Sequence, residues 1–165
     1  MSSLYDADIL LWSEQQADLL RRLARGERVD DAVDWENLIE EVGDVGRSEF
    51  NSLAGLLQTG LTQLLLAHAS RRLEQVGNAK AEVILALAAA ARCYAPSMGP
   101  RLDLGEVWSV AVAVARDKLA ADGGPESPLP ENCPFVVEDL VRRPLELGSL
   151  LVRLGDAAGG PSATR

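Results

Sequence analysis

Apolar residues recur at steps of three and four along much of this chain, the spacing that places them on one face of a helix. Between residues 8 and 24, Ile9, Trp12 and Leu20 share such a face, and polar residues fill most of the other positions. Gly26 then offers a C-terminal stop. This stretch predicts a first helix, with acids at its start and arginines at its end that complement the helix dipole.

A second periodic stretch begins at Trp35 and continues as far as Leu65. Asp34 stands at the N-cap position, and Asn37 occupies the place where a capping box would have Glu or Gln. The segment 43–46 begins and ends with glycine, and each glycine costs about 1 kcal/mol relative to alanine inside a helix. The pattern therefore predicts two consecutive helices with a break or kink near 43–46, or one continuous helix.

Four further helices are predicted in the rest of the chain. Their ranges are 79–94, a stretch capped by Asp103 that runs to Leu119, 135–143 and 145–154. Valines at 110, 112 and 114 alternate with alanine, which is typical of a strand, but no other segment offers a partner strand and a helix is favoured.

Residues 123–134 contain four prolines and two glycines, which predicts an extended surface loop. Residues 157–165 are mostly glycine, alanine, serine and proline, which predicts a disordered tail. The whole pattern predicts an all-α fold, a single-domain helical bundle of about five helices over residues 1–156.

The net charge of the chain argues against two classes of partner, nucleic acids and anionic membranes. The 165 residues hold 16 Lys plus Arg against 25 Asp plus Glu, a formal charge of −9, and such a surface repels both nucleic acid and an anionic membrane. The longest apolar run, 83–91, is about half of the roughly 20 residues that a spanning helix needs. With no signal-peptide pattern at the start, we expect a cytoplasmic protein that binds neither membrane nor nucleic acid.

An acidic run offers the sharpest chemical hypothesis, because carboxylates four residues apart on a helix can bind a divalent metal. The candidate metal ligands are Glu36, Glu40, Glu41 and Asp44. Metal sites in bundles usually add a Glu-x-x-His motif, and the sole histidine, His68, has no such motif. A solvated helix start whose acids suit the dipole is favoured, with the core supplied by Trp35, Leu38 and Ile39.

Motifs for catalysis are missing from the sequence. Nothing local activates His68 or Cys93, and Cys133 has no second histidine to serve it. The glycines near 43–46 lack the lysine and hydroxyl residue of a phosphate-binding loop. We therefore favour a protein that is not an enzyme, and we predict no cofactor.

The leading hypothesis is a helical protein-interaction module, self-associating or serving a protein partner. Leucines cover more than one face of the helix after residue 50, and the predicted interface residues are Leu53, Leu57, Leu61 and Leu64. The alternative is that this helix is the centre of a bundle. Three tryptophans, Trp12, Trp35 and Trp108, are predicted to share a core cluster. A metal-dependent hydrolase and a small acidic antitoxin or inhibitor remain as other functions.

Several short blocks of sequence occur together in a known family. They are Leu4-Tyr5-Asp6, residues 12–20, Asp34-Trp35-Glu36-Asn37-Leu38-Ile39-Glu40-Glu41, Gly46-Arg47-Ser48-Glu49, Pro96-Ser97-Met98 and Glu131-Asn132-Cys133-Pro134. On these blocks the chain resembles the bacterial family called domain of unknown function 29. The resemblance implies an all-α helical bundle and no assigned activity. Members often carry aromatic and basic residues after the leucine-rich helix, where this chain has 67–70, Ala-His-Ala-Ser.

Overall fold

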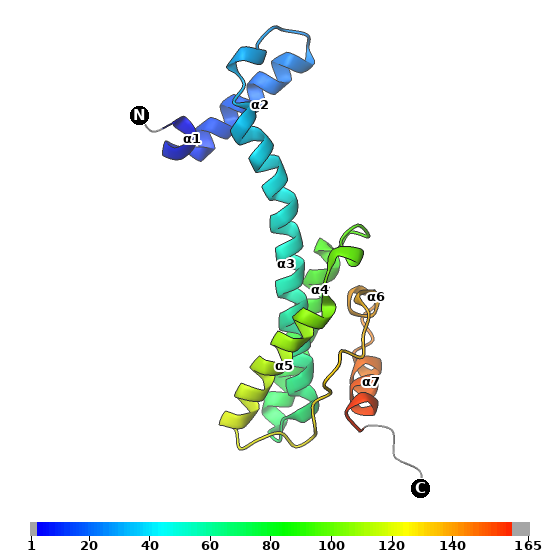
Figure 1. Cartoon of the computed structure of the whole chain (residues 1–165). Helices are drawn as coiled ribbons and strands as arrows, with labels where there is room; N and C mark the ends of the chain where they lie inside the picture. The colour runs from blue at the N-terminus through cyan, green and yellow to red at the C-terminus, as the bar shows by residue number, and fades with distance from the viewer. Residues whose placement is uncertain (1–2, 160–165) are drawn as a thin grey trace. The chain divides into compact units, whose positions relative to one another are not determined.

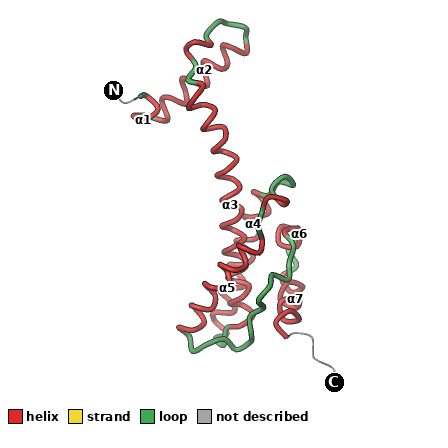
Figure 2. The backbone as a smooth tube through the Cα atoms, viewed as in Figure 1, coloured by secondary structure: helices red, strands yellow, loops and turns green. Residues whose placement is uncertain are grey.

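The computed structural model describes residues 3–159, and every regular element in that range is a helix (Figures 1 and 2). The α-helices are α1 (Leu4–Ala7), α2 (Ile9–Ala24), α3 (Trp35–Ala69), α4 (Leu73–Cys93), α5 (Leu104–Ala121), α6 (Val137–Val141) and α7 (Leu147–Gly159). Two 3-10 turns, η1 (Asp30–Ala32) and η2 (Gly99–Arg101), precede α3 and α5. Five of the α-helices are of substantial length, so the predicted all-α class and the number of main helices are confirmed.

Contacts along the chain divide it into two compact units, residues 1–48 and 49–165, called here the N-terminal unit and the C-terminal unit. The division falls inside α3, which is continuous from Trp35 to Ala69. The break considered near 43–46 does not occur, because two glycines cost little against the cooperativity of a long helix. The single domain over 1–156 stays a prediction, and each unit is described by itself.

The N-terminal unit consists of α1, α2, η1 and the start of α3. The Asp8 carboxylate accepts a hydrogen bond from the Leu11 N–H at 3.0 Å and so caps α2. Gly26 follows α2 at φ +83°, the left-handed conformation that glycine adopts without strain, so the predicted helix end is confirmed. The hydrophobic side chains buried in the described part of this unit are Trp12 and Val33.

The C-terminal unit has the larger core, built from the second half of α3 and from α4, α5, α6 and α7. Leucines of α3 with less than 1% of their surface exposed form its centre. Trp108 of α5 meets the Phe135 ring edge to face, with 6.2 Å between ring centroids. Val112 is buried while Val110 is exposed, so the valine alternation lies on a helix and the helical prediction is confirmed.

The later boundaries agree with the sequence in part. The Asp103 carboxylate caps α5, and residues 123–134 contain no helix, as predicted. The helix predicted over 79–94 begins earlier, at Leu73, and the Gln75 side chain in its first turn bonds to Ser70 and Asp122. α7 continues to Gly159, inside the range predicted as a tail, while 160–165 lie outside the described residues.

Candidate functional site

The predicted metal ligands do not converge in the described structure. Glu41 accepts a hydrogen bond from the Tyr5 hydroxyl at 2.6 Å, and Asp44 forms an ion pair with Arg47. Glu36 and Glu40 are exposed on α3. Within residues 3–159 no three side chains of His, Cys, Asp or Glu form a group that could hold a metal ion.

His68 and Cys133, for which the sequence predicts no catalytic role, lie near the end of α3 and in the 123–134 loop. His68 lies against α7, where a Cβ built on Gly155 would be 3.8 Å from its Cε1, and its Nε2 is buried without a hydrogen-bond partner. The Cys133 thiol donates to the Phe135 carbonyl oxygen at 3.7 Å, and burial raises the pKa of this thiol. A raised pKa lowers the thiolate fraction, so Cys133 is a poor nucleophile at neutral pH.

The predicted interface leucines are core residues. Leu53, Leu57, Leu61 and Leu64 each have 0% of their surface exposed. The prediction that they form a docking surface is therefore wrong, and the alternative of a central bundle helix is the right one. A helical stripe looks the same in sequence whether it is covered by the same chain or by another.

Exposed apolar side chains concentrate instead in the N-terminal unit. Of the fourteen large hydrophobic residues that are exposed in the described chain, eight lie in this unit: Leu4, Ile9, Leu10, Leu11, Trp35, Ile39, Val42 and Val45. The prediction that all three tryptophans share a buried core is wrong, because Trp35 is 47% exposed. Ile39, predicted to be core, is 70% exposed.

Five of these residues lie on α2 and on the start of α3 and are called here the apolar face: Ile9, Trp35, Ile39, Val42 and Val45. Along α3, Trp35, Ile39 and Val42 are spaced by four and three residues and so share one stripe. Val42 and Val45 also line an open groove of about 260 Å³ between α2 and α3, and Ile9 lines it from α2. The rest of the groove is lined by Trp12, Ser13, Gln16, Ala17, Leu20, Leu38 and Glu41.

Asp34 holds α2 and the start of α3 together. Its carboxylate accepts hydrogen bonds from Trp12 Nε1 at 3.0 Å and from Asn37 Nδ2 at 2.8 Å, and the Asn37 N–H donates to it at 3.4 Å. The Asp34 N–H donates to the Gln16 amide oxygen at 2.9 Å. The hydrogen bonds from Asn37 and Trp12 keep the pKa of Asp34 below its ordinary value, and the predicted N-cap is confirmed.

Tyr5 makes a second connection to α3. Its hydroxyl donates to Glu41, and its ring meets Trp12 edge to face with 5.0 Å between centroids. The hydrogen bond to the Glu41 carboxylate raises the pKa of Tyr5 to about 12. Three of the six blocks that carry the family resemblance thus contact one another: Leu4-Tyr5-Asp6 meets the block 34–41 through Glu41, and 12–20 meets it through Asp34.

Negative charge concentrates on the same unit. Residues 1–48 hold 12 Asp plus Glu and 5 Arg, a net charge of −7 out of the chain's −9. Three of those arginines already pair with acids of the unit, Arg22 and Arg25 with Glu27 and Arg47 with Asp44. These ion pairs raise the pKa of Arg22 and lower the pKa of Glu27. The other ten acids of the unit form no ion pair within the described residues.

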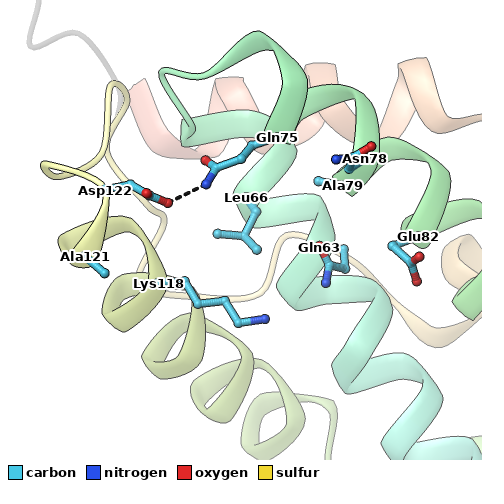
Figure 3. Close-up of a pocket in the computed structure, with 9 residues that line it drawn as sticks. All are labelled: Gln63, Leu66, Gln75, Asn78, Ala79, Glu82, Lys118, Ala121 and Asp122. Carbon is cyan, nitrogen blue, oxygen red and sulfur yellow. Dashed lines mark hydrogen bonds between the residues drawn. The ribbon is translucent and has the colours of Figure 1, made fainter.

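A second concave feature lies in the C-terminal unit. The pocket has a volume of about 450 Å³ and lies between α3, α4 and α5 (Figure 3). Its lining residues are Gln63, Leu66, Gln75, Asn78, Ala79, Glu82, Lys118, Ala121 and Asp122. Helical periodicity does not predict this pocket. In the sequence, the polar residues of the three helices have the pattern of ordinary solvent-exposed faces, and only the packing of the helices brings them together.

The apolar face was also missed, although a sequence signal for it existed. Ile9, Trp35 and Ile39 occupy helical positions that predict burial. Helical spacing does not show whether other segments of the chain cover these positions. Counting charge separately for residues 1–48 would have shown that one part of the chain carries most of the acidic surplus.

No helix in residues 3–159 is long and apolar enough to cross a membrane. Comparison with curated proteins gives no match. A solved structure described as an α-helical protein of unknown function from Rhodospirillum rubrum is 27% identical in sequence, with a TM-score of 0.69. The similarity covers 94% of this chain and 99% of that one.

The sequence model of the family described as "Domain of unknown function DUF29" matches residues 4–144. That range contains both units of the described fold apart from α7. The neighbouring solved structure is helical as well, and its description assigns no activity. The chain belongs to the DUF29 family.

Proposed function

We propose that this protein is a cytoplasmic, non-enzymatic interaction module, and that its N-terminal unit binds an amphipathic, basic helix of a partner protein. The proposal rests on one observation: exposed large hydrophobic residues and negative charge are both concentrated in the N-terminal unit. Eight of the fourteen exposed large hydrophobic residues and −7 of the −9 net charge lie within residues 1–48. Large exposed apolar surfaces on a folded protein mark interaction sites.

The shape of the apolar face supports a helical partner. The groove between α2 and α3 is open and lined mostly by apolar side chains, and the stripe of Trp35, Ile39 and Val42 extends it along α3. An amphipathic helix binds by laying its apolar side into such a groove. Trp35 is a suitable anchor because tryptophan is enriched among the residues that dominate binding energy.

The charge supports a basic partner over a second copy of this chain. An isologous dimer through the apolar face would bring two units of −7 together, and like charges across an interface cost binding energy. Lysines and arginines flanking a partner's apolar stripe would instead pair with exposed acids such as Glu36 and Glu40. A small acidic inhibitor or antitoxin is one kind of protein that would use this surface.

Titration with a synthetic helix tests the proposal. The probe is a fluorescent peptide of roughly 18 residues, or five turns, with leucine on one face and lysine on the other. Two control peptides share its size: one has the same composition in scrambled order, and one replaces lysine by glutamate. We expect the full chain to bind the amphipathic basic peptide at least roughly tenfold more tightly than either control, as measured by fluorescence anisotropy.

Matched variants locate the binding surface. Ile39→Ser removes an exposed side chain from the apolar face, and Ile84→Ser removes an exposed side chain from the C-terminal unit, where Ile84 is 48% exposed. We expect Ile39→Ser to weaken binding and Ile84→Ser to leave it unchanged. Equal binding of all three peptides, or equal loss in both variants, contradicts the proposal. A dimer that forms without peptide and is lost in Ile39→Ser would assign the face to a second copy.

A further inference from the structure

The pocket between α3, α4 and α5 exists because small residues stand where large ones would close it. Ala79 of α4 and Ala121 of α5 line it opposite Leu66 of α3, which packs against the core beneath. Its volume of about 450 Å³ falls within the range of roughly 300–1,000 Å³ that is typical of small-molecule sites. The lining combines an apolar floor with a few polar groups from three helices, as such sites commonly do.

Side chains at one end of the pocket bond to one another in a network of Ser70, Gln75, Asp122 and Arg72. The Ser70 hydroxyl donates to the Gln75 amide oxygen at 2.6 Å, and the Gln75 amide donates to Asp122 (Figure 3). The other carboxylate oxygen of Asp122 pairs with Arg72 at 3.1 Å. Arg72 therefore balances the charge of Asp122. The network connects the end of α3, the start of α4 and the end of α5 around the cavity.

The other polar lining groups have no such partners. Figure 3 shows the Lys118 ammonium extending from α5 toward Gln63 of α3, with the Glu82 carboxylate on α4 beyond it. Within residues 3–159, none of these three side chains makes a hydrogen bond or an ion pair with another residue. The Asn78 side chain, which also lines the pocket, makes none in this range either, so the pocket offers one cation, one anion and two amides that can both donate and accept.

We propose that this pocket binds a small zwitterion of the α-amino acid class with an apolar side chain. The ligand's carboxylate pairs with Lys118, its ammonium pairs with Glu82, and the Gln63 amide bonds to both groups. The apolar side chain lies over Leu66, Ala79 and Ala121. A phosphate-like anion would be repelled by Glu82, and a simple cation would be repelled by Lys118, so a ligand that carries both charges complements the site best.

The test uses leucine and two analogues that each lack one charge, titrated into the full chain by calorimetry. Isopentylamine lacks the carboxylate and N-acetylleucine lacks the ammonium. We expect leucine to bind and each analogue to bind at least roughly tenfold more weakly. In Lys118→Met the preference for leucine over isopentylamine disappears, and in Glu82→Gln the preference over N-acetylleucine disappears, because each variant removes the group that reads that charge.

Two further variants keep the test decisive. Lys80→Met removes the other lysine of the chain, which is exposed on α4 outside the pocket lining, and leaves leucine binding unchanged. Ala121→Leu fills the pocket at an exposed position, so it abolishes binding while the thermal midpoint without ligand is kept. Absence of binding by leucine, valine, methionine and phenylalanine up to about 10 mM overturns the proposal. Equal loss in Lys80→Met and Lys118→Met overturns it as well.

Discussion

In its described residues, the N-terminal unit buries two hydrophobic side chains, Trp12 and Val33, whereas the C-terminal unit buries twenty-three. Large exposed apolar residues show the reverse preference, with eight in the smaller unit and six in the larger one. One chain of ordinary composition thus contains a unit whose apolar side chains form a core and a unit whose apolar side chains face outward. The comparison shows that an apolar stripe on a helix indicates amphipathicity without identifying what covers it.

The first way to test the comparison is to remove the small core of the N-terminal unit. Trp12→Ala deletes a side chain that is 4% exposed, a change that costs roughly 3–5 kcal/mol for a buried tryptophan. We expect amide hydrogen exchange to show loss of protection in α2, with α5 still protected. Equal loss of protection in both helices would show that the two units unfold as one.

Two substitutions on α3 compare buried and exposed positions directly. Leu57→Ala creates a cavity at a fully buried site and lowers the free energy of unfolding by roughly 2–5 kcal/mol. Ile39→Ala removes a side chain that is 70% exposed and changes that free energy by less than about 0.5 kcal/mol. Urea denaturation measures both. A large loss in Ile39→Ala would mean that the apolar face is covered within this chain.

Two glycines of α3 provide a finer comparison. A Cβ built on Gly60 would lie 2.9 Å from Leu87 Cγ, and Leu87 is 1% exposed, so Gly60→Ala overpacks the core and destabilises the protein by roughly 1–3 kcal/mol. A Cβ on Gly46 meets nothing within 4 Å, so Gly46→Ala stabilises the helix by roughly 0.5–1 kcal/mol. Thermal unfolding should shift in opposite directions for the two variants.

The smallest expected effects come from titration of the N-terminal unit. The pKa of Asp34 is lowered in the folded state, so its contribution to stability is present above its ordinary value of 3.8 and is lost as the pH falls through the lower folded value. In the variant Asp34→Asn this acid-dependent loss should be smaller. Unfolding midpoints measured in mildly acidic and more acidic buffers give the comparison.

Tyr5 titrates in the opposite direction. Its pKa is raised from 10.0 to about 12 by Glu41, so its contribution is present below pH 10 and is lost as the pH rises through about 12. Tyrosinate absorbance in the native protein should contain a late component that is missing in Tyr5→Phe. A late component that persists in Tyr5→Phe would contradict the assignment of this raised pKa to Tyr5.

Local features could be predicted from the sequence, and features that depend on distant partners could not. The Asp34 cap and the stop at Gly26 follow from side chains and backbone within a few residues. The side-chain bond from Gln75, in the first turn of α4, reaches Asp122, which is 47 positions away. The predictions for Leu57 and Ile39 were both wrong for the same reason, because helical spacing does not report how many other segments are available to cover each stripe.

Residues 34–41 contain two kinds of position, those that hold the local fold and those that face outward. The bonds from Trp12 to Asp34 and from Tyr5 to Glu41 identify the first kind. Asp34 and Glu41 hold the local fold, while Trp35 and Ile39, their neighbours in sequence, face outward. Substitution of Ile39 would leave the bonds of Asp34 and Glu41 in place, whereas substitution of Trp35 would also remove the hydrogen bond that its Nε1 donates to the Asp30 carbonyl oxygen at 3.2 Å. Residues that hold the N-terminal fold and residues that face outward thus alternate along a single helix, and both kinds lie inside the block that carries the family resemblance.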